Sequence, residues 1–185
     1  MIKSISNAEI TLKKIKGDDL LPLWHIAYGR EEPEWMKWNG PYFKDPVYTW
    51  EAFQKLSANY LNNEFRYGIF VNEQIIGIVS AYYEDNDIEK WLEIGIVLYD
   101  ESIWGRNIGT RAMKLWINHL FGIINLPHIG FTTWSGNLGM IHLGQKIGMT
   151  EEGRIRKVRF WQNQYWDSVK FGILRDEWSE LDWRD

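Results

Sequence analysis

Cysteine is absent from the 185 residues, which excludes disulfide frameworks, thiol nucleophiles and cysteine-based zinc sites. Apolar runs are short as well, and none approaches the ~18 residues that are needed to cross a bilayer. Residues 1–15 lack the apolar core of a secretory signal. The four histidines show no metal-ligand spacing such as H-E-x-x-H. We therefore expect a cytoplasmic protein with no membrane partner and no metal site.

An excess of positive charge is also missing. The net charge is -4 at pH 7 and the pI is near 5.6, which argues against a nucleic-acid partner because such proteins usually carry a strongly basic surface. Hydrophobic residues make up 45% and charged residues 25% of the chain, which are ordinary values for a globular protein. The length fits one domain, so we expect a single domain over residues 1–185.

Acidic residues are unevenly distributed. None of the 25 lies between Glu101 and Glu151, where about seven would be expected at their mean frequency. Tryptophan, in contrast, is abundant, with 12 copies. The acid-free segment is suited to a polyanionic ligand.

Strand and helix patterns alternate along the chain without a linker or an internal repeat. Apolar and alternating runs predict strands over residues 9–15, 66–71, 75–83, 90–98, 129–134, 154–161 and 165–174, with the last two joined across Asn163-Gln164. Apolar residues at helical spacing predict helices after Asp18 or Asp19, after Thr49, and over residues 107–121 and 138–147. Residues 29–48 predict a long loop. This order indicates a mixed α/β sheet covered by helices.

The richest local signal is the run from Ile103 to Thr110, between a predicted strand and a predicted helix. A helix N-terminus presents unpaired N–H groups, and small residues such as Gly105 and Gly109 let an anion approach the backbone. The run is neither the dinucleotide fingerprint nor the P-loop, so NAD and ATP lack their usual motifs. A different phosphate-bearing cofactor is therefore indicated, although a glycine pair before a helix can also be a plain tight turn.

Three ordered motifs carry a family resemblance. Residues 104–109 correspond to the loop Q/R-x-x-G-x-G/A, residues 93–100 resemble a strand and its exit, and Asn137 with residues 146–149 matches an N…K-L-G-F/M stretch. Together they resemble the GNAT superfamily of N-acetyltransferases, including its ribosomal-protein N-terminal acetyltransferase branch, where Trp before Gly is familiar. Asn107 replaces a motif glycine, and Asn tolerates positive φ well. The resemblance implies a single-domain, mostly antiparallel mixed sheet flanked by helices, and acetyl-CoA as cofactor.

The resemblance also implies which residues bind acetyl-CoA. The loop amides would hold the pyrophosphate, the strand at residues 96–98 would pair with the pantetheine, and Asn137 would contact the cofactor near diverging strands. The expected cofactor-binding residues are Ile96, Val97, Leu98, Trp104, Gly105, Arg106, Asn107, Ile108, Gly109, Thr110, Asn137 and Lys146.

Glu93 is the candidate general base for amine acetylation, because it is the one carboxylate in an otherwise apolar run over residues 92–98. Strand alternation does not decide whether Glu93 faces the active site or solvent, so both orientations stay open. The general acid is open too. Many family members carry Tyr and Ser where this chain has Gly144 and Met140, which leaves another hydroxyl such as Tyr99, a water molecule, or no acid at all.

The acceptor amine is expected at the loop over residues 31–43, which mixes carboxylates with aromatic side chains that attract an ammonium group. The candidate substrate residues are Glu34, Trp35, Trp38 and Tyr42. In the alternative interpretation, these aromatic side chains pack the loop onto the core.

The sequence thus predicts an acetyl-CoA-dependent N-acetyltransferase that acts on a primary amine, either a small molecule or a protein N-terminus, by direct attack on the thioester. Two alternatives are a non-catalytic acyl-CoA-binding module of the same fold and an aromatic-rich peptide or carbohydrate binder. The acceptor and the oligomeric state are left open.

Overall fold

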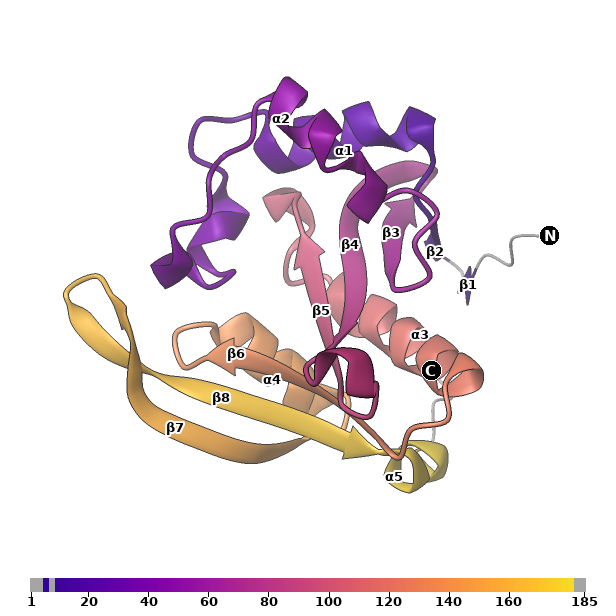
Figure 1. Cartoon of the computed structure of the whole chain (residues 1–185), viewed down its shortest axis with the longest axis vertical. Helices are drawn as coiled ribbons and strands as arrows, with labels where there is room; N and C mark the ends of the chain where they lie inside the picture. The colour runs from indigo at the N-terminus through magenta and orange to yellow at the C-terminus, as the bar shows by residue number, and fades with distance from the viewer. Residues whose placement is uncertain (1–4, 7–8, 182–185) are drawn as a thin grey trace. The chain divides into compact units, whose positions relative to one another are not determined.

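The computed structural model describes residues 5–6 and 9–181 (Figure 1). The strands are β1 Ile5–Ser6, β2 Ile10–Lys14, β3 Arg66–Val71, β4 Gln74–Tyr83, β5 Leu92–Leu98, β6 His128–Trp134, β7 Thr150–Trp161 and β8 Gln164–Leu174. The α-helices are α1 Leu20–Tyr28, α2 Trp50–Lys55, α3 Ile108–Ile123, α4 Leu138–Lys146 and α5 Arg175–Glu180. In this part of the chain, no helix combines the length and the apolar character needed to cross a membrane.

The strands pair in the order β1-β2-β3-β4-β5-β6-β8-β7. The β5–β6 pair is parallel, whereas β1–β2, β2–β3, β3–β4, β6–β8 and β7–β8 are antiparallel. Tyr99 N donates to Ile76 O and Glu84 N donates to Trp91 O, both at 2.9 Å, so β4 and β5 also run antiparallel. The expected mixed, mostly antiparallel sheet flanked by helices is confirmed.

The chain divides into two compact units. Among the described residues, the first unit contains residues 5–6, 9–80 and 95–116, and the second contains residues 81–94 and 117–181. β4, β5 and α3 each begin in one unit and end in the other. The expectation of a single domain over residues 1–185 stays a prediction.

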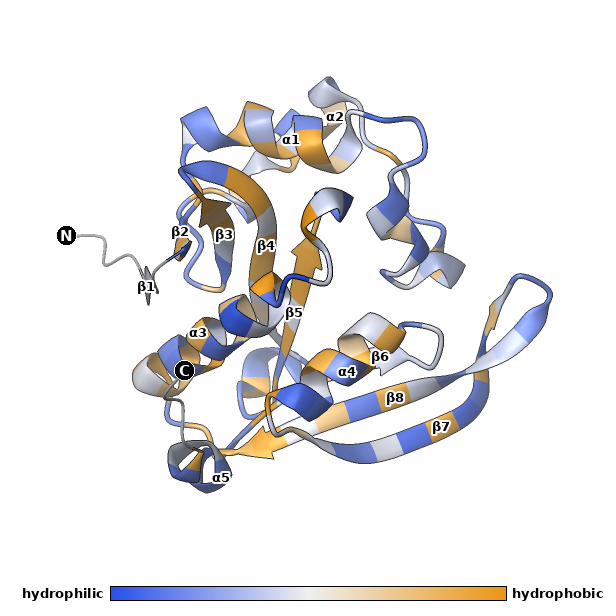
Figure 2. Ribbon diagram, turned by 180° about the vertical axis from the view of Figure 1, so that it is seen from behind, coloured by the Kyte–Doolittle hydropathy of each residue, from blue (hydrophilic) through white to orange (hydrophobic). Residues whose placement is uncertain are grey.

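The core of the first unit is rich in aromatic side chains from α1, α2 and the strands. Tyr28 lies at its centre, with ring centroids 5.7 Å from Trp35, 5.3 Å from Tyr48 and 5.9 Å from Phe53. Thr49 caps α2 by accepting a hydrogen bond from Ala52 N at 3.3 Å, as expected. β4 and β5 carry mostly hydrophobic residues, whereas β7 is largely hydrophilic (Figure 2).

The core of the second unit lies between α4 and one face of β6 and β8. The rings of Phe131 and Phe171 stack 5.2 Å apart, and a Cβ at Gly144 of α4 would lie 2.8 Å from the Phe131 ring. Arg175, the first residue of α5, donates hydrogen bonds to the carbonyls of Phe121, Ile124 and Leu126. Phe121 lies in the last turn of α3, where the helix itself provides no donor for its carbonyl, and the other two carbonyls follow the end of the helix.

Several expected boundaries were wrong. α2 ends at Lys55 and is followed by a 3-10 helix over Ser57–Asn59, and the expected loop over residues 29–48 contains 3-10 helices at Glu34–Lys37 and Pro41–Phe43. The last hairpin turns at Gln162 and Asn163, with φ of 50° and 58°, one residue earlier than expected. β1 and α5 were not expected, because two and six residues carry too little periodicity.

Candidate functional site

The loop assigned to the CoA pyrophosphate lies between β5 and α3 in the first unit. The Trp104 indole nitrogen donates to Leu98 O at 3.1 Å, which ties the loop to the end of β5. Gly105 has φ 76° and Asn107 has φ 59°, so Asn107 adopts a left-handed conformation, which asparagine tolerates well. A Cβ at Gly105 would meet nothing within 4 Å, and a ligand can therefore approach the backbone closely here.

The start of α3 supplies the electrostatics of this loop. The first hydrogen bond of the helix joins Arg111 N to Asn107 O at 3.0 Å. The amides of Ile108, Gly109 and Thr110 precede that bond, and the helix offers no acceptor for them. Exposed Arg106 adds a cationic side chain, whereas Arg111 pairs with Glu9 at 2.7 Å. Left-handed turns, first-turn amides and open space together fit the pyrophosphate of CoA.

The second half of β5 is flanked on one edge by β4. A Cβ at Gly77 would lie 2.2 Å from Val97 O, so only glycine permits this close approach of the two backbones. Ile96, Val97 and Leu98 are half-buried, and Val97 and Trp104 pack against the core of the first unit. The pairing of this half-strand with pantetheine stays a prediction.

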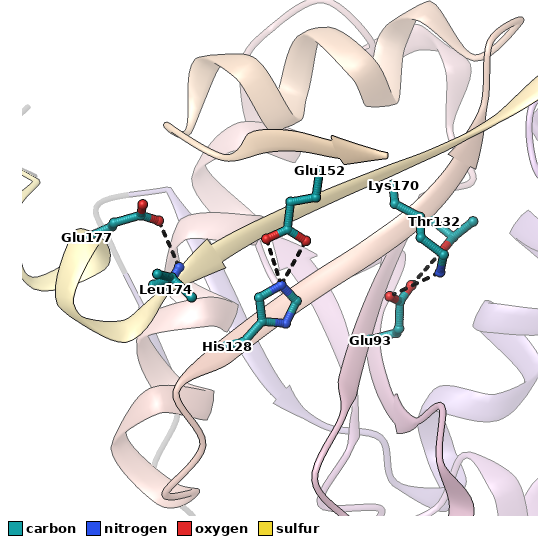
Figure 3. A network of polar contacts seen from close by, with 7 residues as sticks. All are labelled: Glu93, His128, Thr132, Glu152, Lys170, Leu174 and Glu177. Carbon is teal, nitrogen blue, oxygen red and sulfur yellow. Dashed lines mark hydrogen bonds and ion pairs between the residues drawn. The ribbon is translucent and has the colours of Figure 1, made fainter. Parts of the chain in front are cut away.

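Glu93 lies in the second unit and is only 2% exposed, so the solvent-facing orientation is wrong. Its Oε2 accepts a hydrogen bond from the Thr132 hydroxyl at 2.8 Å, and its Oε1 lies 3.7 Å from Lys170 Nζ (Figure 3). Its register partner on β6 is Gly130, where a Cβ would lie 3.3 Å from Glu93 Oε1. A catalytic role for Glu93 stays a prediction.

Four residues around Glu93 were missed from the sequence: Tyr82, Trp91, Thr132 and Lys170. Burial, followed by the charges of Glu93 and Glu84, raises the pKa of Tyr82 to about 12. Lys170 Nζ lies 5.1 Å from the Trp91 ring centroid. One signal for Thr132 and Lys170 is present in the sequence: each is a polar residue between buried neighbours of the same strand. Their position beside Glu93 depends on strand pairing, which the local pattern does not contain.

A second polar pair lies on the same face of the sheet. His128 Nε2 is 2.9 Å from Glu152 Oε2, and both side chains fold over Gly172, where a Cβ would lie within 2.3 Å of each. Gly172 faces Gly130 in the β6–β8 ladder. The two glycines therefore leave the space that these side chains occupy. Figure 3 shows His128 and Glu152 directed toward each other.

Asn137 and Lys146 bound α4, also in the second unit. The Asn137 side chain caps the helix by accepting a hydrogen bond from Met140 N at 3.0 Å. This capping role was not expected from the sequence. Lys146 is the last residue of α4 and is exposed. Contact of either residue with the cofactor stays a prediction.

The position where many family members carry tyrosine is closed to a side chain. A Cβ at Gly144 would lie 2.8 Å from Phe131 and 3.1 Å from Phe171, so a larger residue would displace stacked rings. Tyr99, the alternative hydroxyl, is buried in the aromatic core with its ring 5.1 Å from Trp35. Burial raises the pKa of Tyr99 well above its usual value.

The expected acceptor loop divides into buried and exposed residues. Trp35 is 7% exposed and donates to Ala27 O at 2.7 Å, so it packs as the alternative interpretation predicted. Trp38 is 40% exposed, and the Tyr42 ring lies 4.7 Å from Phe43. Glu34 Oε2 accepts a hydrogen bond from Lys37 Nζ at 2.6 Å. Whether this loop binds the acceptor stays a prediction.

Within residues 5–6 and 9–181, no three His, Asp or Glu side chains are arranged to hold a metal ion.

Comparisons with known proteins agree with the fold. Residues 9–150 match the family model of the acetyltransferase (GNAT) domain. The spermidine N(1)-acetyltransferase of Escherichia coli strain K12 is 26% identical over 142 residues, which cover 74% of each chain.

Two solved structures share the fold over nearly the whole chain. A GNAT-family acetyltransferase from Bacillus anthracis has a TM-score of 0.77 and 19% identity, covering 95% of this chain and 100% of that one. The spermidine N-acetyltransferase of Vibrio cholerae, solved with CoA and spermine, has a TM-score of 0.76 and 20% identity, covering 94% and 100%.

The family match covers the loop at residues 104–110, the strand that carries Glu93 and most of the core. It favours an enzyme over a non-catalytic CoA-binding module and over a peptide or carbohydrate binder. This chain belongs to the GNAT acetyltransferase family, whose members use acetyl-CoA as the acetyl donor for N-acetylation.

Proposed function

We propose that this enzyme acetylates a primary amine of a small polyamine of the spermidine type. Support comes from the similarity over 142 residues to a spermidine N(1)-acetyltransferase. A protein N-terminus, the acceptor of the ribosomal-protein branch, is the competing assignment.

The observation that carries this proposal is the way the acceptor loop already holds an ammonium group. The pKa of Lys37 is raised, first by its hydrogen bond to Glu34 and then by the charges of Glu34, Glu32 and Glu101. Three carboxylates therefore act on one exposed primary ammonium. A polyamine presents several ammonium groups along a flexible chain, so it complements such a cluster better than a single charge does.

Acetyl-CoA supplies the activated acetyl group as a thioester. The amides of residues 105–110 would hold its pyrophosphate, with Arg106 adding positive charge. Ile96, Val97 and Leu98 would align its pantetheine arm, while Trp104 fixes the loop to β5 through its bond to Leu98 O.

Glu93 would remove the proton from the acceptor ammonium and so free the nitrogen lone pair for attack on the thioester carbonyl. Its Oε2 is engaged by Thr132, so Oε1 is the oxygen that would take the proton. The acid for the leaving thiolate is unassigned. Gly144 and Met140 carry no hydroxyl, and a thiolate is already a fair leaving group.

The test is to incubate the protein with acetyl-CoA and one acceptor at a time, following release of free thiol. Spermidine and spermine should stimulate release, and mass spectrometry should locate the acetyl group on a primary nitrogen. Release with peptides alone would assign a protein N-terminus instead, and no acceptor-dependent release would contradict the proposal.

The loop is tested by Glu34→Gln and Glu32→Gln. Each should raise the KM for spermidine about 3–10-fold and raise the KM for a monoamine acceptor less. The reason is that a polyamine has more ammonium groups to pair with the carboxylate cluster. Glu51→Gln, an exposed residue of α2, is the matched control and should change neither KM. An equal effect of all three substitutions would refute a role for the loop.

A further inference from the structure

Lys170 holds its ammonium group beside the buried carboxylate of Glu93. Its Nζ is 2.8 Å from Thr132 Oγ1 and 3.7 Å from Glu93 Oε1, and it lies over the Trp91 ring. Lys170 and Thr132 face each other in the β6–β8 ladder. The backbone register, rather than a flexible loop, therefore sets this geometry (Figure 3).

The directions of the hydrogen bonds follow from the chemistry of the three groups. A lysine ammonium only donates, so the Thr132 oxygen accepts from Lys170. A hydroxyl has one hydrogen, and that hydrogen is then directed at Glu93 Oε2, 2.8 Å away. Lys170 thus orients the hydroxyl, and the hydroxyl orients the carboxylate.

The two carboxylate oxygens are consequently different. Oε2 is engaged by Thr132, whereas Lys170 lies 3.7 Å from Oε1, beyond hydrogen-bond distance. The lysine charge compensates a carboxylate that is 2% exposed, and its bond to Thr132 keeps it from occupying Oε1. Oε1 keeps its capacity to accept a proton.

We propose that Lys170 is a positioning residue for deprotonation of the acceptor amine, acting on Glu93 through Thr132. This inference rests on the proposed function, in which an N–H bond of the acceptor ammonium breaks as an O–H bond forms at Glu93 Oε1. The nitrogen lone pair then forms a C–N bond to the thioester carbonyl carbon. The C–S bond breaks, and the CoA thiolate leaves and takes up the second proton that the nitrogen loses. Lys170 does not touch the acceptor and does not exchange its own proton in this step.

The test compares Lys170→Met, Lys170→Arg and Thr132→Val by steady-state kinetics with acetyl-CoA and the best acceptor. We expect Lys170→Met and Thr132→Val each to lower kcat by about 10–100-fold, with both KM values within about threefold of the original protein. Lys170→Arg keeps the charge and the donor, so it should recover most of the lost kcat.

The decisive result is that the effects of the Glu93 and Lys170 substitutions on kcat do not add. A purely structural role of Lys170 would not produce this result. In a Glu93→Gln background, Lys170→Met should lower kcat no further, because the residue through which it acts is already disabled. If Lys170→Met does not fold, as judged by circular dichroism, Thr132→Val in the same background is the test.

Failure of this inference differs from failure of the proposed function. If Glu93→Gln lowers kcat but Lys170→Met does not, or if the two effects multiply, the positioning role is overturned and Glu93 remains the base. If Glu93→Gln leaves kcat unchanged at saturating substrates, the base assignment and the role of Lys170 both fail. Absence of acetyl transfer to any amine would overturn the proposed function itself.

Discussion

Trp35 links the loop over residues 31–43 to the first helix through a hydrogen bond that the substitution Trp35→Phe removes. Its indole N–H donates to Ala27 O at 2.7 Å. Ala27 is one of the last residues of α1, so no backbone N–H of the helix donates to its carbonyl. Phenylalanine keeps a ring against Tyr28 and Tyr99 and removes the donor.

The expected cost follows from that geometry. Leaving a buried carbonyl without its donor costs about 1–3 kcal/mol, and the smaller ring leaves a partly unfilled volume that adds to it. We expect the free energy of unfolding to fall by about 2–3 kcal/mol in total. For a chain of 185 residues, this lowers Tm by roughly 4–12 °C.

Urea unfolding followed by tryptophan fluorescence measures the loss, and acetylation kinetics measure function in the same preparation. The acceptor KM should stay within about twofold, because Trp35 is 7% exposed and packs in the core. Trp38→Phe, at a 40% exposed position, should affect stability less. A loss below about 0.5 kcal/mol for Trp35→Phe, or a large rise in acceptor KM without loss of stability, would refute the packing role.

Two further substitutions test the second unit. Gly144→Tyr should lower the free energy of unfolding by about 3 kcal/mol or more, because its Cβ would already meet the stacked rings of Phe131 and Phe171. A gain in kcat with unchanged Tm would show that a tyrosine acid can act there. The pKa of Asp167 is lowered, first by a hydrogen bond from Lys157 N and then by Arg154. Its stabilising contribution is therefore present above the ordinary carboxyl pKa of about 3.9 and is lost as pH falls through the lower, folded value. Asp167→Asn should be less stable than the original chain at pH 6, and the urea midpoints of the two proteins should converge once the pH is below the folded pKa of Asp167. Equal midpoints at pH 6 would contradict this assignment.

The local elements that sequence reasoning placed well are those with strong periodicity. β3 spans the predicted residues 66–71, and Thr49 caps the start of α2 as predicted, because side-chain alternation and capping depend on near neighbours. The left-handed φ at Asn107 is compatible with the sequence reasoning, since asparagine tolerates positive φ well. The helix α5 was missed because six residues carry too little periodicity. The turn at Gln162 was misplaced by one residue because several turn positions satisfy the same pattern.

The candidate site also has a part that the local sequence indicates and a part that depends on strand pairing. The loop at residues 104–110 could be predicted as a phosphate site from the sequence, because anion binding by consecutive backbone amides depends on one short stretch of chain. The surroundings of Glu93 were not, because Thr132 and Lys170 come from strands that are adjacent in space but distant in sequence. Alternation leaves the two faces of a strand equivalent until pairing selects the buried one. Composition and short motifs therefore lead to an acetyltransferase, whereas strand register buries Glu93 and sets Lys170 beside it.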